Sequence, residues 1–176
     1  MNTKTVLITG ASSGIGEGCA RIFARNGHRV ILNGRNLERL MAVKTSLEAD
    51  YGAQAYLLPF DVRDRAAASA ALDSLPPEWK DIDVLVNNAG FGISGAAEFT
   101  ASQDAHRLME VNLFGMVNLT TAVLPHMRRA GRKMPPGPHW AKIFFFICAM
   151  AFFSRRETWA WEMWISSATS IWVLPS

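Results

Sequence analysis

The sequence predicts an α/β protein built on a doubly wound parallel sheet, and three observations predict it. Short apolar runs of strand length alternate with segments of helical spacing over the first 132 residues. The apolar runs carry few polar residues, as expected for strands that are buried on both faces. A glycine-rich turn joins the first run to the first helical segment, which is a connection that such sheets use.

The first part of the chain alternates two strands with two helices. Residues 5–9 (TVLIT) form a β-branched apolar run of strand length. Residues 14–26 place their apolar side chains on one helical face, and Gly27 is well placed to end that helix. Residues 30–32 predict a second buried strand, and residues 37–47 return to helical spacing.

The same alternation continues through the next segments. Residues 53–60 predict a third strand, and residues 63–75 predict an Ala-rich helix that two prolines close. Residues 82–86 (IDVLV) predict a fourth strand. Residues 101–129 predict a long helical segment, which ends in cations suited to a helix C-terminus. The crossovers between parallel strands should be right-handed.

The turn after the first strand has the glycine spacing G-x-x-x-G-x-G. It comprises Gly10, Ala11, Ser12, Ser13, Gly14, Ile15 and Gly16. Glycine permits a tight turn and lets the backbone approach a pyrophosphate, and the following helix directs free N–H groups at that anion. The alternative is a plain glycine-rich loop. The position between a strand and a helix favours a Rossmann-like, dinucleotide-binding turn made of all seven residues.

Four ordered motifs resemble those of the short-chain dehydrogenases/reductases. They are TGASSGIG, the pair Asp61-Val62, the run Asn87-Asn88-Ala89-Gly90 and the N-x-x-G of Asn112 to Gly115. The resemblance covers about residues 4–132, and residues 61–90 look especially similar to NADP-dependent dehydrogenases acting on serine and 3-hydroxy acids. It implies hydride transfer between NADP(H) and an alcohol or carbonyl substrate.

The resemblance also implies roles for individual residues. The pyrophosphate would be lined by Gly10, Ser12, Gly14, Ile15 and Gly16. Asp61 would accept a hydrogen bond from the adenine amino group, with Val62 packed beside it, and a helix N-cap is an alternative or additional role for Asp61. Asn88, Ala89 and Gly90 would run past the nicotinamide-side ribose. A purely structural role is the alternative for Asn88.

The end of the second strand favours NADP(H) over NAD(H). NAD-type sites place a carboxylate there, on the ribose 2′-OH. Here Arg35 and Asn36 follow the strand, and no carboxylate occurs before Glu38. A guanidinium fork suits a 2′-phosphate, so we assign Arg35 and Asn36 to the cofactor site. The alternative for Arg35 is a solvated surface cation.

Most of the residues that the family uses for catalysis are missing. The resemblance assigns Asn112 to the catalytic tetrad, where it holds a water in the proton relay; a solvated helix Asn is the alternative. The family also uses a Ser after the fifth strand and a Tyr-x-x-x-Lys on the next helix. Here the only tyrosines are Tyr51 and Tyr56, and Cys148 stands about where the Ser is expected. Without a general acid, we do not expect normal catalysis from this chain alone.

The composition changes after residue 132. Residues 133–176 hold five of the six Trp and five of the ten Phe, but one of the 13 Gly. An apolar run there fits a fifth strand over 143–147; an interfacial Trp anchor and a lost coding frame are the alternatives. We divide the chain into a dinucleotide-binding domain, 1–132, and a divergent aromatic-rich tail, 133–176. The expected fold is therefore a C-terminally truncated one.

Charge and cysteine content exclude several classes of protein. The 18 basic and 15 acidic residues leave a net charge of +3, which is too small and scattered for a nucleic-acid-binding protein. Cys19 and Cys148 have neither metal-ligand spacing nor a disulfide framework. We therefore expect a cytoplasmic protein with no metal site and no membrane partner.

Three functions follow from these observations. The first is an NADP(H)-dependent oxidoreductase with defective catalysis. The second is a non-catalytic module that binds a dinucleotide or a protein partner, and the third is a membrane-associated fragment. A homo-oligomer is compatible with each of them, and the substrate is not readable from the sequence.

Overall fold

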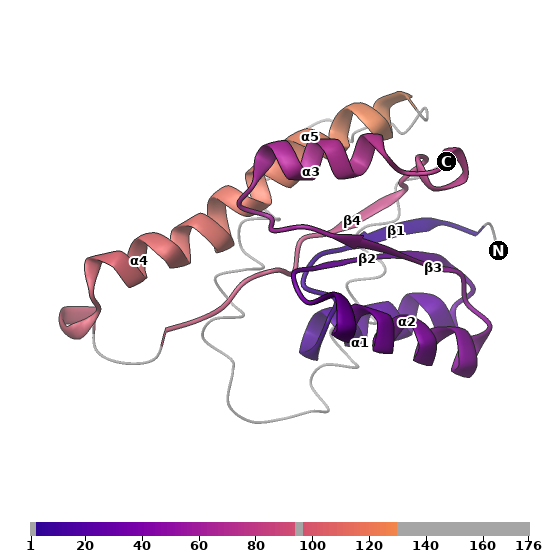
Figure 1. Cartoon of the computed structure of the whole chain (residues 1–176), viewed down its shortest axis with the longest axis horizontal. Coiled ribbons are helices and arrows are strands. Elements are labelled where there is room, and N and C mark those ends of the chain that lie inside the picture. Colours follow the sequence, from indigo (N-terminus) through magenta and orange to yellow (C-terminus); the bar gives the residue numbers. More distant parts are fainter. Residues whose placement is uncertain (1–2, 94–96, 130–176) are drawn as a thin grey trace.

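The computed structural model describes residues 3–93 and 97–129 and shows a four-stranded parallel sheet between two layers of helices (Figure 1). The strands are β1 (Thr5–Ile8), β2 (Arg29–Gly34), β3 (Ala55–Pro59) and β4 (Val84–Val86). The helices are α1 (Gly14–Arg25), α2 (Leu37–Tyr51), α3 (Arg65–Asp73), α4 (Ser102–Met109) and α5 (Met116–Arg129). Short 3₁₀ turns lie at η1 (Pro77–Trp79) and η2 (Ala97–Phe99), and a π-helical segment, η3 (Glu110–Gly115), joins α4 to α5.

The strand order is β3-β2-β1-β4, so β1 lies inside the sheet. Val6 of β1 pairs in parallel with Val30 of β2 on one side and with Val84 of β4 on the other. All four residues of β1 are buried, which explains why its sequence is apolar without alternation. The predicted doubly wound sheet is therefore confirmed.

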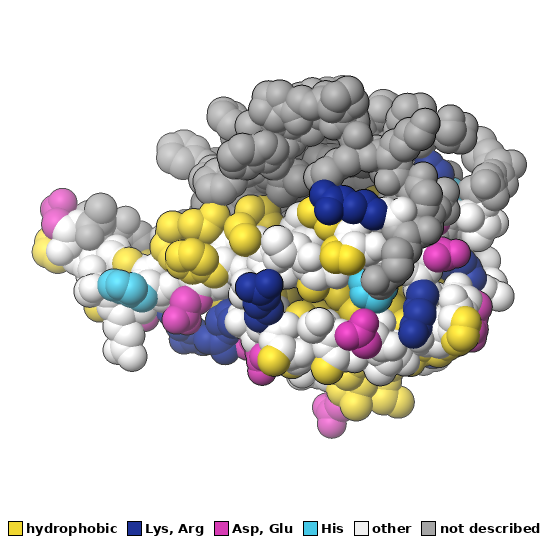
Figure 2. Space-filling view, turned by 90° about the horizontal axis from the view of Figure 1, so that it is seen from above, with side chains coloured by type: hydrophobic (Ala, Val, Ile, Leu, Met, Phe, Trp, Pro, Cys, Tyr) yellow, Lys and Arg dark blue, Asp and Glu magenta, His cyan; other side chains and the backbone are white. Residues whose placement is uncertain are grey.

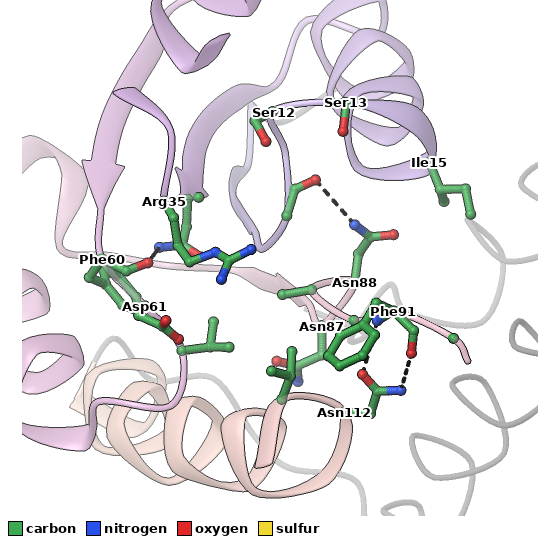
Figure 3. Close-up of a pocket in the computed structure, with 18 of the residues that line it drawn as sticks. Ser12, Ser13, Ile15, Arg35, Phe60, Asp61, Asn87, Asn88, Phe91 and Asn112 are labelled. Atoms are coloured by element: carbon green, nitrogen blue, oxygen red, sulfur yellow. Dashed lines mark hydrogen bonds between the residues drawn. The ribbon is translucent and has the colours of Figure 1, made fainter. Parts of the chain in front are cut away.

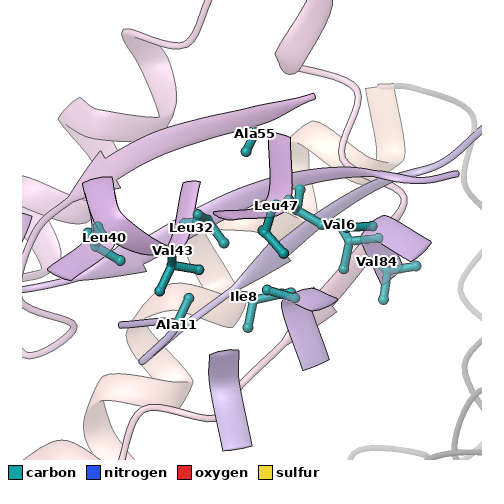
Figure 4. Close-up of a cluster of buried hydrophobic side chains, with 12 residues drawn as sticks. Val6, Ile8, Ala11, Leu32, Leu40, Val43, Leu47, Ala55 and Val84 are labelled. Carbon is teal, nitrogen blue, oxygen red and sulfur yellow. The ribbon is translucent and has the colours of Figure 1, made fainter. Parts of the chain in front are cut away.

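Each face of the sheet carries its own hydrophobic core. On one face α1 and α2 cover the sheet, and Leu40, Val43 and Leu47 of α2 pack with Val6 and other strand residues (Figures 1 and 4). On the opposite face α3 and α5 pack together over the sheet and close the second core. That core includes Leu7, Ile31, Leu72, Leu119 and Val123, all fully buried.

The ends of α1 and α2 have identifiable causes. The chain after α1 turns at Gly27, whose φ is +76°, as the sequence predicts. The side chain of Asn36 accepts a hydrogen bond from the Arg39 amide and caps the start of α2. α2 runs to Tyr51, four residues past the predicted end, because the left-handed residue that stops it is Gly52 (φ +60°).

The start of α3 corrects one expectation. Asp64 is the residue that caps this helix, and its carboxylate accepts a hydrogen bond from the Ala67 amide at 2.9 Å. Asp61, for which a helix N-cap was an alternative role, lies three residues earlier and binds Arg63 instead. The helix starts later than predicted because residues 61–64 form a turn, in which the Asp64 amide bonds the Asp61 carbonyl.

The predicted helix over 101–129 is a continuous helical run with the six-residue π-helical segment in its middle. By length and composition alone the run Ser102–Arg128 could cross a membrane. Leu119 and Val123 on it are fully buried against the second core, as in a helix of a globular domain. Its outer side exposes Met109, Phe114 and Val117, and hydrophobic side chains lie along this side in Figure 2.

The predicted fifth strand over 143–147 and the rest of the tail, 133–176, lie outside the described residues. The described residues therefore all belong to the first predicted domain, 1–132.

Candidate functional site

A cavity of about 540 Å³ lies at the carboxyl ends of the strands, where parallel sheets bind ligands (Figure 3). Its walls come from the turn after β1, the ends of β2 and β3, the loop after β4, and the helical run α4–η3. The lining residues are Gly10, Ser12, Ser13, Ile15, Asn33, Gly34, Arg35, Phe60, Asp61, Val62, Asn87, Asn88, Ala89, Gly90, Phe91, Gly92, Arg107, Val111 and Asn112. The structure thus brings residues from four separate sequence motifs around one space.

At Gly10 and Gly16 the turn after β1 is packed so closely that a side chain has no room. A Cβ atom on Gly16 would stand 2.2 Å from the carbonyl oxygen of Gly10 and 2.6 Å from Nδ2 of Asn88. Gly10 and Gly14 have positive φ angles, +64° and +57°, which glycine adopts without strain. The turn therefore needs glycine at these positions, and it brings the start of α1 to the cavity wall, where an anion would meet free N–H groups.

Asn88 joins the turn after β1 to the loop after β4. Its side-chain amide donates to the carbonyl oxygens of Thr9 at 2.9 Å and Gly10 at 3.4 Å. The hydroxyl of Thr9 accepts from the amides of Asn88 and Ala89, each at 2.8 Å, and donates to the carbonyl of Val86. The structural role that the sequence left open for Asn88 is therefore present, and Thr9 is a partner that sequence reasoning missed.

Asn33 performs a similar task at the ends of β2 and β3. Its side-chain amide donates to the carbonyl oxygens of Leu58 at 2.9 Å and Phe60 at 3.2 Å. Its own carbonyl accepts from the Ala11 amide. Asn33 is 1% exposed, and its Oδ1 atom is buried without a hydrogen-bond partner in the described part of the chain. Asn33 thus fixes the backbone just before Asp61, and no sequence pattern pointed to it.

The carboxylate of Asp61 is held by Arg63. The Arg63 amide donates to Oδ1 at 3.0 Å, and its guanidinium donates to Oδ2 at 2.7 Å. These hydrogen bonds lower the pKa of the Asp61 carboxyl below its usual range, with a smaller contribution from the positive charge of Arg35. Asp61 is therefore ionised at neutral pH and oriented in the cavity wall.

A second hollow adjoins the cavity beside Arg35. It is lined by Ser12, Ser13, Arg35, Asn36 and Arg39. Among the described residues, two guanidinium groups line this hollow and no carboxylate does. Asn36, which the sequence assigned to the cofactor site, caps α2 and lines only this hollow.

Asn112 clamps the loop after β4. Its Oδ1 accepts from the Phe91 amide at 3.0 Å, and its Nδ2 donates to the Phe91 carbonyl at 2.8 Å (Figure 3). A Cβ atom on Gly90 would stand 3.0 Å from Oδ1 of Asn112, so glycine permits this approach. Asn112 sits in the π-helical segment, and such widened turns are frequent at functional sites.

Besides Asn36, three residues of the predicted site do not line the cavity. Ala11 is fully buried in the core, Gly14 has a positive φ in the turn, and Gly16 packs against Gly10 and Asn88. No group of three potential metal ligands occurs within residues 3–93 and 97–129. Burial raises the pKa of the Cys19 thiol, which lies in α1 outside the cavity, and Cys148 is not among the described residues.

Comparison with known proteins extends these observations. The family model described as short chain dehydrogenase matches residues 4–134. The NADP-dependent 3-hydroxy acid dehydrogenase of Salmonella typhi is 44% identical over 128 residues, which are 72% of this chain and 50% of that protein. The chain thus spans about half the length of the curated relatives it matches.

Solved structures agree with this match. The crystal structure of serine dehydrogenase from Escherichia coli is 44% identical, has a TM-score of 0.65, and is matched over 70% of this chain and 56% of that chain. A closed form of serine dehydrogenase complexed with NADP⁺ has the same identity and TM-score, over 70% of this chain and 48% of that chain. The strand order, the glycine turn and the matched residues together place this chain in the short-chain dehydrogenase family.

Proposed function

We propose that the cavity binds NADP(H), and that the chain derives from an oxidoreductase that transfers hydride between this cofactor and an alcohol or carbonyl substrate. The observation that carries the proposal is the closed glycine turn beside Arg35 at a cavity of cofactor size. Glycines in such a turn let the backbone approach a pyrophosphate, and Gly10 lines the cavity. The relatives support the cofactor, since one is named NADP-dependent and another was solved with NADP⁺.

The two ends of the cavity suit the two ends of the dinucleotide. Asp61, ionised and held by Arg63, would accept a hydrogen bond from the adenine amino group, with Val62 beside it. The segment Asn88–Gly90 would run past the nicotinamide-side ribose. Ser12 and Ser13 line both the cavity and the second hollow. They would lie near the phosphates, to which their hydroxyls can donate hydrogen bonds.

Arg35 supports NADP(H) over NAD(H). It lines both the cavity and the neighbouring hollow, and no carboxylate stands at the end of β2 to bind a free ribose 2′-OH. Its guanidinium can bind a 2′-phosphate through two parallel hydrogen bonds. Arg39 lines the same hollow, so the local charge favours an anion there.

Carbonyl reduction needs a proton donor besides the hydride, and among the described residues no tyrosine of this chain lines the cavity. Tyr51 and Tyr56 are its only tyrosines. Tyr56 packs against Trp79 in the second core with ring centroids 5.5 Å apart, and neither tyrosine lines the cavity. Asn112 would contribute to a proton relay only in the presence of such a donor. We therefore propose cofactor binding without normal turnover by the chain alone.

A non-catalytic binding module is the second candidate, and the missing tyrosine favours it. In that function the cavity holds a dinucleotide, and an aromatic tail contacts a protein or a membrane. Measurable NADPH oxidation with any carbonyl compound would favour the enzyme. Vesicle co-sedimentation that requires residues 140–176 would favour the membrane-associated form.

Calorimetric titration of the full chain with NADPH and with NADH tests the proposal. We expect tighter binding of NADPH, and we expect Arg35→Gln to weaken NADPH about tenfold to a hundredfold, because a charge-assisted hydrogen bond contributes about 1.5–3 kcal/mol. Arg25→Gln removes the same charge at the end of α1, away from the cavity, and should change neither affinity. Binding of neither cofactor by the unmodified chain would contradict the proposal.

A further inference from the structure

A second cation lies in the cavity wall, at the end away from Arg35. Arg107 of α4 lines the cavity, and its guanidinium carbon lies 5.7 Å from the centre of the Phe91 ring. That ring belongs to the loop whose backbone Asn112 clamps on both its N–H and its carbonyl. Figure 3 shows Phe91 and Asn112 together on the side of the cavity opposite Arg35. The ring therefore gives the exposed Arg107 side chain a favoured position, since a guanidinium is attracted to an aromatic face.

Among the described residues, the charges around the cavity leave Arg107 without an acidic partner. The charged lining residues are Arg35, Arg107 and Asp61. The Asp61 carboxylate is bound by Arg63, and the carboxylate of Glu110, three residues from Arg107, also faces Arg63 at 3.9 Å. Within the described residues no carboxylate lies within ion-pair distance of Arg107. The wall at this end thus carries an unneutralised guanidinium.

We propose that Arg107 binds the carboxylate of the substrate, so that the site takes a small hydroxy acid or the corresponding keto acid. This inference rests on the proposed function, which places the nicotinamide at this end and the anionic 2′-phosphate at Arg35. An anionic group other than the cofactor's phosphates is then the ligand that suits Arg107. A planar guanidinium matches a carboxylate through two parallel hydrogen bonds.

The position of Arg107 fits such a role. It lines the same cavity as Val111, one helical turn further along, and as Gly90 and Asn112, where the reacting end of the cofactor would lie. The relatives named for 3-hydroxy acids and for serine act on compounds that carry a carboxylate. Arg107 supplies a group in this chain that would distinguish those acids from neutral alcohols of the same size.

Binding to the full chain loaded with NADP⁺ tests the inference without requiring turnover. The probes are 3-hydroxybutyrate and its neutral analogue 1,3-butanediol, each titrated by calorimetry. We expect the acid to bind more tightly than the diol. Arg107→Gln should weaken the acid about tenfold, which corresponds to about 1.4 kcal/mol, and should leave the diol and NADPH unchanged. Arg107→Lys should retain part of the affinity, because it keeps the charge and loses the fork.

Arg25→Gln is the matched control, because it removes one exposed positive charge at the end of α1 and Arg25 does not line the cavity. Equal binding of acid and diol by the unmodified chain, or equal loss in the Arg107 and Arg25 variants, would overturn the inference. If NADPH binds and the acid does not, the proposed function stands and the inference fails. If the acid binds through Arg107 and NADPH does not bind, the proposed function fails and the carboxylate site stands.

Discussion

Replacing Gly16 with alanine is expected to open the glycine turn and destabilise the domain. The added Cβ atom would lie 2.2 Å from the Gly10 carbonyl oxygen and 2.7 Å from its carbon, and backbone atoms cannot rotate away. The turn must then move by about 1 Å, at the cost of about 1–3 kcal/mol that overpacking typically has. The same movement weakens the hydrogen bonds of Asn88 to Thr9 and Gly10, each contributing about 1 kcal/mol. We expect a loss of about 2–4 kcal/mol in total.

Gly18→Ala is a matched control in the same helix. Nothing lies within 4 Å of a Cβ atom built on Gly18, and alanine is favoured over glycine inside a helix by about 0.5–1 kcal/mol. The two substitutions therefore add the same methyl group with opposite expected signs. Urea unfolding followed by far-ultraviolet circular dichroism measures both, and NADPH binding should weaken only in the Gly16 variant. Equal changes in the two variants, or a stable Gly16 variant, would refute the reasoning.

Three further perturbations test other contacts. Arg63→Gln should raise the pKa of Asp61. In the unmodified chain the paired carboxylate stabilises the fold above its unfolded pKa of about 3.9, and this stabilisation is lost as pH falls through the lower folded pKa. The free energy of unfolding, measured from pH 7 to 3, should therefore depend less on acid in the variant. Burial lowers the pKa of His28, so near and below about pH 6.5 the unfolded chain binds more protons than the folded chain. The free energy of unfolding should therefore fall between pH 7 and 5, and His28→Gln should reduce that fall in the same titration. Asn112→Ala removes both hydrogen bonds to the Phe91 backbone, each of which contributes about 0.5–1.5 kcal/mol. Hydrogen exchange at the Phe91 amide should therefore accelerate, and an unchanged rate would show that these bonds do not hold the loop.

Much of the fold could be predicted because its signals are local. A buried strand such as β1 is readable from a run of β-branched residues, and the glycine turn is readable from its spacing after that run. Arg35 could be assigned because the end of β2 is defined by the same local pattern. Element ends were harder to predict. α2 continues to Tyr51 because the left-handed residue that stops it is Gly52, and Leu47 carries no stop signal.

The remaining features depend on partners that are distant in the sequence. Thr9 is recognisable only once the amides of Asn88 and Ala89, about 80 residues later, are known to reach its hydroxyl. Asn33 bonds carbonyls 25 and 27 residues away, and an Asn in a strand has no sequence signature for that. Arg107 is one of many helix cations until Phe91 and the cavity are placed beside it. The approach of Gly115, at the end of the π-helical segment, to Val62 is likewise a contact between residues distant in the sequence.

Hydrogen exchange of the full chain with and without saturating NADPH tests most directly whether this cavity holds the cofactor. Binding there predicts slower exchange in three separate segments: the turn 10–16, the turn 61–63 and the loop 88–92. The far ends of the same strands, at residues 4–5 and 82–84, should exchange at unchanged rates. Protection confined to other segments, or no protection at NADPH concentrations that saturate a calorimetric titration, would contradict the account.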